Sequence, residues 1–293
     1  MPTRAIVIGE TTLAAQCAQL LRTCGHSVEA AFSQGTAPLK RWADSSAIPH
    51  FTDIADLTGF ASILTVDYLF SIVNYSVLPS ALLGFPCLCI NYHDGPLPLY
   101  AGLYATSWAI INGETRHGIT WHVMIDRIDA GDILKQTAVP ITGTETVHSL
   151  NVKCHVAAFR TFAVLVRELD TQTVARTPQD LTRRTYYGRS RWKSTVIPWD
   201  WTADAIDRFC RALAFHPESN PIGEPTVELN GTTFTVSRAI PCPGTGKPPG
   251  SIVHVGDAYI QVATARGDVR LEGVRSLNGR EVNRSSLKES LLQ

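Results

Sequence analysis

A strand, helix and second strand at the start of the chain constrain its fold more than any other feature. Arg4–Ile8 is a short apolar strand, Gly9 opens a turn, and apolar residues at helical spacing then continue to a stop signal at Gly25. A second apolar strand covers Val28–Phe32. Two strands joined by a helix within ~30 residues are typical of a parallel α/β sheet. The chain is therefore predicted to begin with an α/β domain.

The mostly apolar strand Tyr68–Val73 adds to this prediction, because strands covered on both faces are apolar throughout. We expect a Rossmann-like, mostly parallel sheet with helices on both faces. The first turn, from Ile8 to Leu13, lacks the G-x-G-x-x-G pattern that cradles a dinucleotide pyrophosphate. The sheet therefore gives no reason to expect NAD binding.

The last third of the chain has a different pattern. One helix is predicted over Ala203–Phe215, and short strand-like runs separated by turn signals follow it. Asn230-Gly231 lies between two such runs and is a strong signal for a β-hairpin. We predict a catalytic domain at 1–185, a linker at 186–200 and a small β-barrel domain at 201–293, whose tail, Arg280–Gln293, is expected to fray.

Composition narrows the function classes. Lys and Arg together number 26, equal to Asp and Glu, so the formal net charge is zero and nucleic-acid binding is not expected. No apolar run approaches the ~18 residues of a membrane span, and no signal peptide is expected. The seven cysteines are scattered without a Cys-x-x-Cys pair, so we predict neither a disulfide framework nor a metal site. These features together predict a cytoplasmic protein.

An amide and an imidazole follow the apolar run Cys87–Ile90. Asn91 and His93 are two residues apart, so they point to the same side of a strand. A later apolar run ends in a loop that contains Asp129. An amide donor, a titratable ring and a carboxylate can together stabilise an oxyanion and move a proton, as acyl transfer requires. Each residue alone also has a structural interpretation, as a satisfied histidine, a turn asparagine or a strand-ending aspartate.

The joint pattern resembles the folate-dependent formyltransferase family, which carries Asn-x-His, a loop with Pro and Gly, and a strand that runs into Asp-x-Gly. Here these pieces are Asn91-Tyr92-His93, Gly95-Pro96-Leu97-Pro98, and Gly118-Ile119-Thr120 leading to Asp129-Ala130-Gly131. The resemblance implies a 10-formyltetrahydrofolate co-substrate and a C-terminal OB-like β-barrel.

The resemblance also implies roles for the three site residues. Asn91 and His93 would donate to the developing oxyanion, and His93 would return a proton to the leaving nitrogen. Asp129 would orient His93 and take the proton of the amine. Asp126 and Asp132 compete for the carboxylate role, and the family pattern favours Asp129. His122 is either a core histidine held by Thr120 or a group that tunes Asp129.

Folate is expected in a slot at the carboxyl ends of the strands, where open parallel sheets bind ligands. The residues expected to contact it follow two apolar strands: Val73, Asn74, Tyr75, Leu78, Ile125, Asp126 and Ile128. Plain loop packing is the alternative interpretation of these positions.

The acceptor amine is less constrained. The stretches His93–Gly102, Thr120–His122 and Ala130–Leu134 are similar to formylation domains of nonribosomal peptide and polyketide synthases. Leu99, where a basic residue is usual, and residues 34–60 depart from that pattern. We expect the acceptor to be the α-amine of an aminoacyl thioester on a carrier protein. The expected protein partner is a peptidyl carrier protein or adjoining synthase domains.

Three other functions stay open: transfer to a nucleotide-linked amino sugar, hydrolysis of 10-formyltetrahydrofolate, and a non-catalytic recruitment module. The segment after the site, Leu97–Trp108, has no Lys or Arg and so offers no attraction to the phosphates of tRNA. The basic and aromatic segment Arg183–Lys193 either binds a polyanion or packs as a linker.

Overall fold

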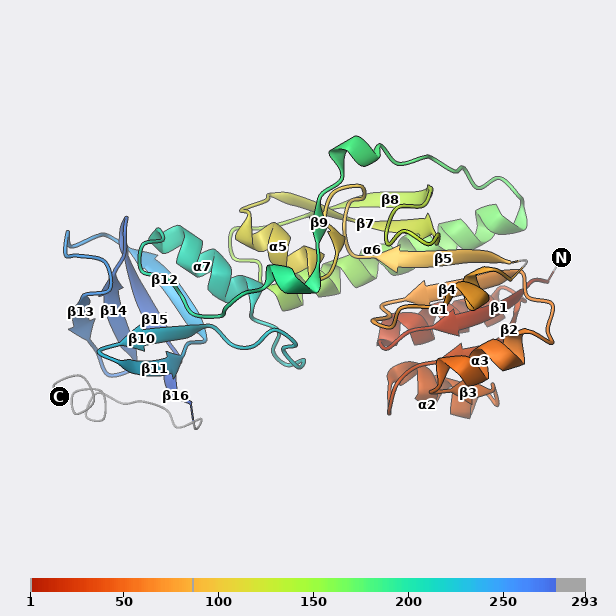
Figure 1. The fold of residues 1–293 in the computed structure, drawn as a ribbon, viewed down its shortest axis with the longest axis horizontal. Helices are drawn as coiled ribbons and strands as arrows, with labels where there is room; N and C mark the ends of the chain where they lie inside the picture. Colours follow the sequence, from red (N-terminus) through yellow and green to blue (C-terminus); the bar gives the residue numbers. More distant parts are fainter. Residues whose placement is uncertain (1, 86, 278–293) are drawn as a thin grey trace. The chain divides into compact units, whose positions relative to one another are not determined.

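The computed structural model describes residues 2–85 and 87–277, and its chain divides into two compact units (Figure 1). The first unit comprises the chain up to Ala105, Arg116–Pro140 and Val152–Tyr187. The second comprises Thr106–Thr115, Ile141–Asn151 and the chain from Gly188 onward. The predicted domain limits 1–185, 186–200 and 201–293 remain a proposal, and the tail Arg280–Gln293 lies outside the described residues.

The first unit is built on a seven-stranded sheet in the order β3-β2-β1-β4-β5-β7-β8. The strands are β1 (Arg4–Ile8), β2 (Ser27–Phe32), β3 (His50–Phe51), β4 (Tyr68–Ile72), β5 (Leu88–His93), β7 (Arg116–Val123) and β8 (Ile133–Pro140). The first five are parallel, β7 is antiparallel to β5, and β8 is antiparallel to β7. The predicted mostly parallel α/β sheet is confirmed.

Helices cover both faces of this sheet. The unit contains α1 (Thr12–Thr23), α2 (Pro38–Ser45), α3 (Ile54–Ala61), α4 (Ser80–Leu83), η1 (Leu181–Arg183) and most of α6 (Val147–Asp170). On one face, Leu57 of α3 and Leu82 of α4 join an apolar cluster with Ile8. On the other, Phe162 of α6 packs its ring 5.1 Å from that of Phe70 and 5.0 Å from that of Trp121.

The second unit is a small β domain with its own core. It contains α5 (Ala105–Ile111, from Thr106), η2 (Arg189–Arg191), α7 (Ala203–Ala212), β10 (Thr226–Leu229), β11 (Thr232–Thr235), β12 (Arg238–Cys242), β13 (Ile252–Val255), β14 (Tyr259–Ala263), β15 (Asp268–Glu272) and β16 (Arg275–Ser276). A four-stranded antiparallel sheet, β12-β15-β14-β13, and a three-stranded sheet, β10-β11-β16, share an apolar cluster with α7. The predicted second, β-rich domain is confirmed, although the described strands form two sheets and not one closed barrel.

The ends of two helices are set by local backbone geometry. Helix α5 begins at Ala105, because Tyr104 has a φ of 59°, which no α-helical residue adopts. The helix predicted to end at Phe215 ends at Ala212, where the Leu213 N–H bonds to the Cys210 carbonyl in a tighter turn. Within the described residues, none of the helices combines the length and the apolar character needed to cross a bilayer.

Candidate active site

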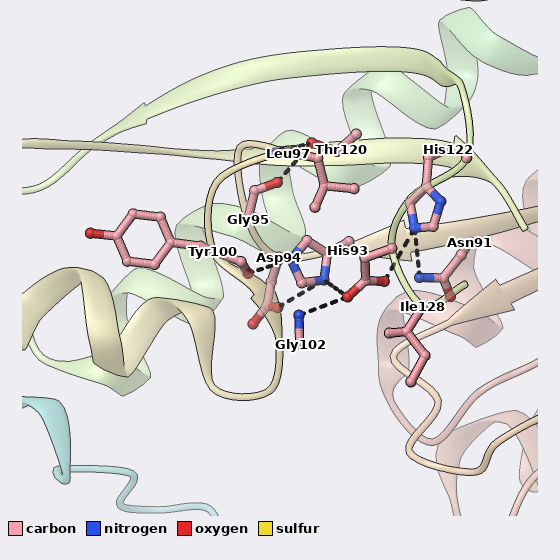
Figure 2. Close-up of polar contacts among 12 residues, drawn as sticks. Asn91, His93, Asp94, Gly95, Leu97, Tyr100, Gly102, Thr120, His122 and Ile128 are labelled. Carbon is pink, nitrogen blue, oxygen red and sulfur yellow. Dashed lines mark hydrogen bonds and ion pairs between the residues drawn. The ribbon is translucent and has the colours of Figure 1, made fainter. Parts of the chain in front are cut away.

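The proposed site lies at the carboxyl end of β5, where Asn91 and His93 project from the strand. β7 pairs with this strand so that Asn91 is opposite His122 and His93 is opposite Thr120. Directly opposed residues of an antiparallel pair point to the same side of the sheet. The register therefore gathers two histidines, an asparagine and a threonine from two strands, as Figure 2 shows.

Asp129 completes this cluster from the loop between β7 and β8. Its Oδ2 accepts a hydrogen bond of 2.8 Å from the N–H of Gly102 and lies 3.6 Å from His93 Nδ1. Its Oδ1 lies 3.4 Å from His122 Nε2. The structure thus brings together Asn91, His93 and Asp129, the three predicted catalytic residues, with His122 as a fourth member.

The loop that presents Asp129 has an unusual backbone, since Asp129 itself has a φ of 51°. Gln179 Nε2 donates to the carbonyl oxygens of Asp129, at 3.1 Å, and of Gly131, at 2.6 Å. A Cβ on Gly131 would lie 2.0 Å from the Val123 carbonyl oxygen, so only glycine fits there. This close approach is a physical reason for the Asp-x-Gly pattern.

His93 and His122 each have one ring nitrogen hydrogen-bonded to a main-chain carbonyl. His93 Nε2 lies 2.8 Å from the Tyr100 oxygen, and His122 Nδ1 lies 2.9 Å from the Val123 oxygen. A carbonyl oxygen only accepts hydrogen bonds, so these two nitrogens carry protons. The remaining nitrogens, His93 Nδ1 and His122 Nε2, face Asp129, and a second proton on either ring forms an ion pair with that carboxylate.

The charge of Asp129 is strongly stabilised. Burial opposes ionisation, but His93, His122 and the Gly102 N–H together outweigh it and hold the pKa of Asp129 far below its usual range. A carboxylate with such a low pKa is a weak proton acceptor. This environment favours an orienting role for Asp129 over the expected role of taking the proton of the amine.

The expectation that Thr120 holds His122 is wrong. The Thr120 hydroxyl instead donates to the Gly95 oxygen at 2.7 Å and accepts the Leu97 N–H. His122 Nε2 lies 3.2 Å from Asn91 Nδ2, so a neutral His122 accepts one amide proton and orients the Asn91 side chain. The contact between His122 and Asn91 follows from the pairing of β5 with β7, which places the two residues opposite each other.

Sequence reasoning also missed two main-chain groups in the loop after β5, the Tyr100 carbonyl and the Gly102 N–H. This loop is fixed by β6 (Ala101–Gly102), which pairs with β9 (Tyr186–Tyr187), and by the Tyr100 N–H bond to the Thr185 hydroxyl. Gly102 has a φ of 102°, and a Cβ there would lie 2.3 Å from the Tyr187 oxygen. Glycine is therefore required where the loop donates to Asp129.

The residues predicted to contact folate lie on two loops of the first unit. After β4, Val73 has a φ of 51° and accepts the Glu10 N–H, while the Asn74 side chain closes a turn with Ser76. Tyr75 is 70% exposed, whereas Leu78 is buried in the apolar cluster beneath α3 and α4. A folate contact for Leu78 would require that cluster to open.

The second loop follows β7. Ile125 and Ile128 are 48% and 51% exposed, and Asp126 is exposed. The Ile128 carbonyl accepts a hydrogen bond of 2.9 Å from Arg184. Large apolar side chains left open to solvent on a loop beside a polar cluster are typical of a ligand-binding surface. Among the described residues, no group of three or more His, Cys, Asp and Glu is arranged to hold a metal ion.

Two stretches of the chain match known families. Residues 55–166 match the family described as formyl transferase, and residues 191–291 match the formyl transferase C-terminal domain. A methionyl-tRNA formyltransferase of Geobacillus sp. (strain WCH70) is 30% identical over 233 residues, which cover 78% of this chain and 71% of that protein.

Solved structures share the fold. An N-formyltransferase from Helicobacter canadensis, in complex with folinic acid and dTDP-3-aminofucose, has a TM-score of 0.74 at 17% identity, covering 93% of this chain and 99% of that one. HypX from Aquifex aeolicus, in complex with tetrahydrofolic acid, has a TM-score of 0.67 at 16% identity, covering 99% of this chain and 47% of that one. Identities this low establish the common fold alone.

Proposed function

Since the chain belongs to the folate-dependent formyltransferase family, we propose that it transfers a formyl group from 10-formyltetrahydrofolate to the α-amine of an aminoacyl thioester on a carrier protein. The observation that carries the chemistry is the convergence of Asn91, His93 and Asp129. The acceptor rests on the sequence pattern around the site and on the charge of the segment that follows it.

The two loops beside the cluster fit the folate. Tyr75, Val77, Ile125 and Ile128 all expose large apolar side chains. A flat pterin ring needs apolar cover on its faces and peptide groups at its edge, and loops that leave β4 and β7 offer both. We assign Val73, Asn74, Tyr75, Ile125, Asp126 and Ile128 to this contact, and keep Leu78 as a buried support. When bound, the folate supplies an electrophilic formyl carbonyl.

Three side chains then divide the work. Attack by an amine builds negative charge on the formyl oxygen, and preorganised donors commonly contribute most of the rate by stabilising it. The Asn91 amide, which His122 orients, is such a donor. His93 in its doubly protonated form donates from Nδ1 and can protonate the leaving nitrogen, and it takes back the proton that the attacking nitrogen releases. Asp129 stabilises the His93 cation at 3.6 Å.

A carrier-bound aminoacyl group is supported over tRNA by charge. The segment from Asp94 to Asn112 has a single charged side chain, that of Asp94 itself, and no Lys or Arg. Phosphate-rich acceptors gain affinity from basic side chains, which this segment lacks. An aminoacyl thioester on a carrier protein presents the same α-ammonium ion without the many phosphates of a tRNA.

A nucleotide-linked amino sugar is the second candidate acceptor. It is favoured by the likeness to the Helicobacter canadensis N-formyltransferase, whose complex contains dTDP-3-aminofucose and which the chain matches over nearly its whole length. The same cluster would serve, because both acceptors are primary amines. The absence of basic side chains between Asp94 and Asn112 gives a diphosphate no partner in that segment.

The purified chain is incubated with 10-formyltetrahydrofolate and with an aminoacyl-loaded carrier protein, a dTDP-linked amino sugar, or no acceptor. We expect mass spectrometry to show one added formyl group on the aminoacyl carrier, and no added formyl group with the His93→Ala variant. Formylation of the sugar alone would assign the second candidate. Formate release at the same rate with and without acceptor would assign a hydrolase, and equal function in wild type and His93→Ala would indicate a recruitment module.

A further inference from the structure

A second carboxylate lies next to the catalytic histidine. Asp94 follows the last residue of β5, and its Oδ1 is 4.0 Å from His93 Nδ1, the same nitrogen that faces Asp129 (Figure 2). The two carboxylates differ in environment. The Asp129 side chain is 8% exposed and faces two imidazoles, whereas that of Asp94 is 35% exposed. A molecule that arrives from solvent can therefore contact the Asp94 carboxylate next to His93 Nδ1.

The backbone holds Asp94 in a defined place even though its side chain is open. Its carbonyl oxygen accepts a hydrogen bond of 2.6 Å from His117 Nε2, and the next carbonyl, that of Gly95, accepts one of 2.7 Å from the Thr120 hydroxyl. Both donors belong to β7, the strand that also carries His122. Because these bonds fix the backbone of Asp94, only its short side chain remains to be ordered when a ligand pairs with it.

The charge near Asp94 selects for a cation. From Asp94 to Asn112 the chain has no Lys, Arg or His, so no basic side chain of that segment competes for the carboxylate. Asp129 is less suited to this task, because its oxygens already face Gly102, His93 and His122. The open side of Asp94 complements a small cationic group such as a primary ammonium ion.

We propose that Asp94 binds the acceptor through its ammonium group and so holds the amine beside His93 before it is deprotonated. This inference rests on the proposed N-formyltransferase function and names the recognition residue for its acceptor. The chemical class it selects is a primary amine that is cationic at neutral pH, whether on an aminoacyl thioester or on an amino sugar. Asp94 binds this group, while deprotonation passes the ammonium proton to solvent.

The experiment compares Asp94→Asn with wild type, using two kinds of acceptor. For a primary amine we expect KM to rise about 10-fold or more, from loss of a charge-assisted contact, with kcat and the KM for folate changing by less than about 2-fold. For an alkoxyamine, which is already neutral at pH 7, KM stays the same. Asp94→Glu recovers part of the affinity, and Asp56→Asn, an exposed carboxylate in the first turn of α3, changes neither parameter.

The pH dependence separates binding from a structural role. An α-ammonium group titrates near pH ~8, so the KM advantage of wild type over Asp94→Asn shrinks as pH rises beyond that point. Among the described residues, the ionisable groups near Asp94 are His93 and Tyr92 on β5 and His117 on β7, and Asp129 shares His93 Nδ1 with it. Asp94→Asn leaves all four in place. Circular dichroism confirms that the variant is folded.

Three results for Asp94→Asn would overturn the inference: an unchanged KM for the primary amine, an equal rise in KM for the neutral alkoxyamine, or a KM difference from wild type that persists at high pH. Failure of the proposed carrier-bound acceptor gives a different result: the aminoacyl carrier is not formylated, whereas the amino sugar is. The comparison of Asp94→Asn with wild type is then made with the amino sugar as acceptor. Formylation of the alkoxyamine but of neither primary amine would overturn both.

Discussion

The proposed catalytic cluster at the end of β5 and the two loops beside it differ in how many of their contacts the protein itself supplies. His93, His122 and Asp129 are buried, and each is already held by contacts from the chain. Tyr75, Val77, Ile125 and Ile128 instead expose large apolar surfaces. The protein alone preorganises the proposed catalytic groups, whereas the proposed folate surface is left for the ligand to cover. Substitutions in the two regions are therefore expected to change different kinetic parameters.

His93→Ala is the strongest test of the preorganised side. The variant loses both a donor to the formyl oxygen and the acid for the leaving nitrogen, so we expect kcat to fall about 10³–10⁴-fold. The KM for folate stays within about 3-fold, because the apolar loops are unchanged. Steady-state transfer assays measure both, with His254→Ala in β13 as the matched control. A kcat within 10-fold of wild type would remove His93 from the chemistry.

Asp129→Asn is expected to lower kcat by about 10²–10³-fold, because protonated His93 loses its counter-ion and the Gly102 N–H loses its charged acceptor. The KM for folate again changes little. An effect on KM alone would move Asp129 from the chemical cluster to the binding surface.

The same variant gives a pH signature. The pKa of Asp129 in the folded chain is depressed below the 3.8 of an unperturbed aspartate, so the ionised side chain stabilises the fold above about pH 4. As pH falls further, Asp129 is protonated in the unfolded chain before it is protonated in the folded chain, and this stabilisation is lost. We expect the difference in unfolding free energy between wild type and Asp129→Asn to narrow on acidification. Urea unfolding at about pH 5, 4 and 3 measures it. A difference that widens would contradict the assignment.

His122→Ala tests the fourth member of the cluster. The variant frees the Asn91 amide, which lies 3.2 Å from His122 Nε2, and small misplacements of a donor cost up to about 10²-fold in rate. We expect kcat to fall about 10–10²-fold with both KM values nearly unchanged. His122→Asn, which keeps a hydrogen-bonding group on β7, is expected to recover part of the loss. Equal losses in the two variants would indicate a packing effect.

The smallest effects are expected on the apolar loops. Tyr75→Ser and Ile128→Ser each remove about 1–2 kcal/mol of apolar contact with folate, so KM or Kd for folate is expected to rise about 5–30-fold with kcat unchanged. Ile63→Ser is the control, because Ile63 is an exposed apolar residue on neither loop. Fluorescence titration with folate measures the affinity. If Ile63→Ser weakens binding as much, the assigned surface is wrong.

The sequence alone determined the features that depend on local pattern. Alternation along the strand placed Asn91 and His93 on one side, apolar periodicity predicted the α/β sheet, and Asn230-Gly231 marked the hairpin between β10 and β11. The order of Asn91-x-His93 and Asp129-Ala130-Gly131 pointed to the family. These features depend only on residues that are close together in the sequence, so the spacing of those residues is enough to predict them.

Only the tertiary structure decided what surrounds these residues. The β5–β7 register places His122 opposite Asn91, the positive-φ turn at Gly102 aims an N–H at Asp129, and α3 with α4 buries Leu78. The low pKa of Asp129 follows from groups 27 and 36 residues away in sequence, Gly102 and His93. Strand order and loop backbone angles bring such groups together, and hydrophobic periodicity, which reports only which face of an element is buried, does not encode them.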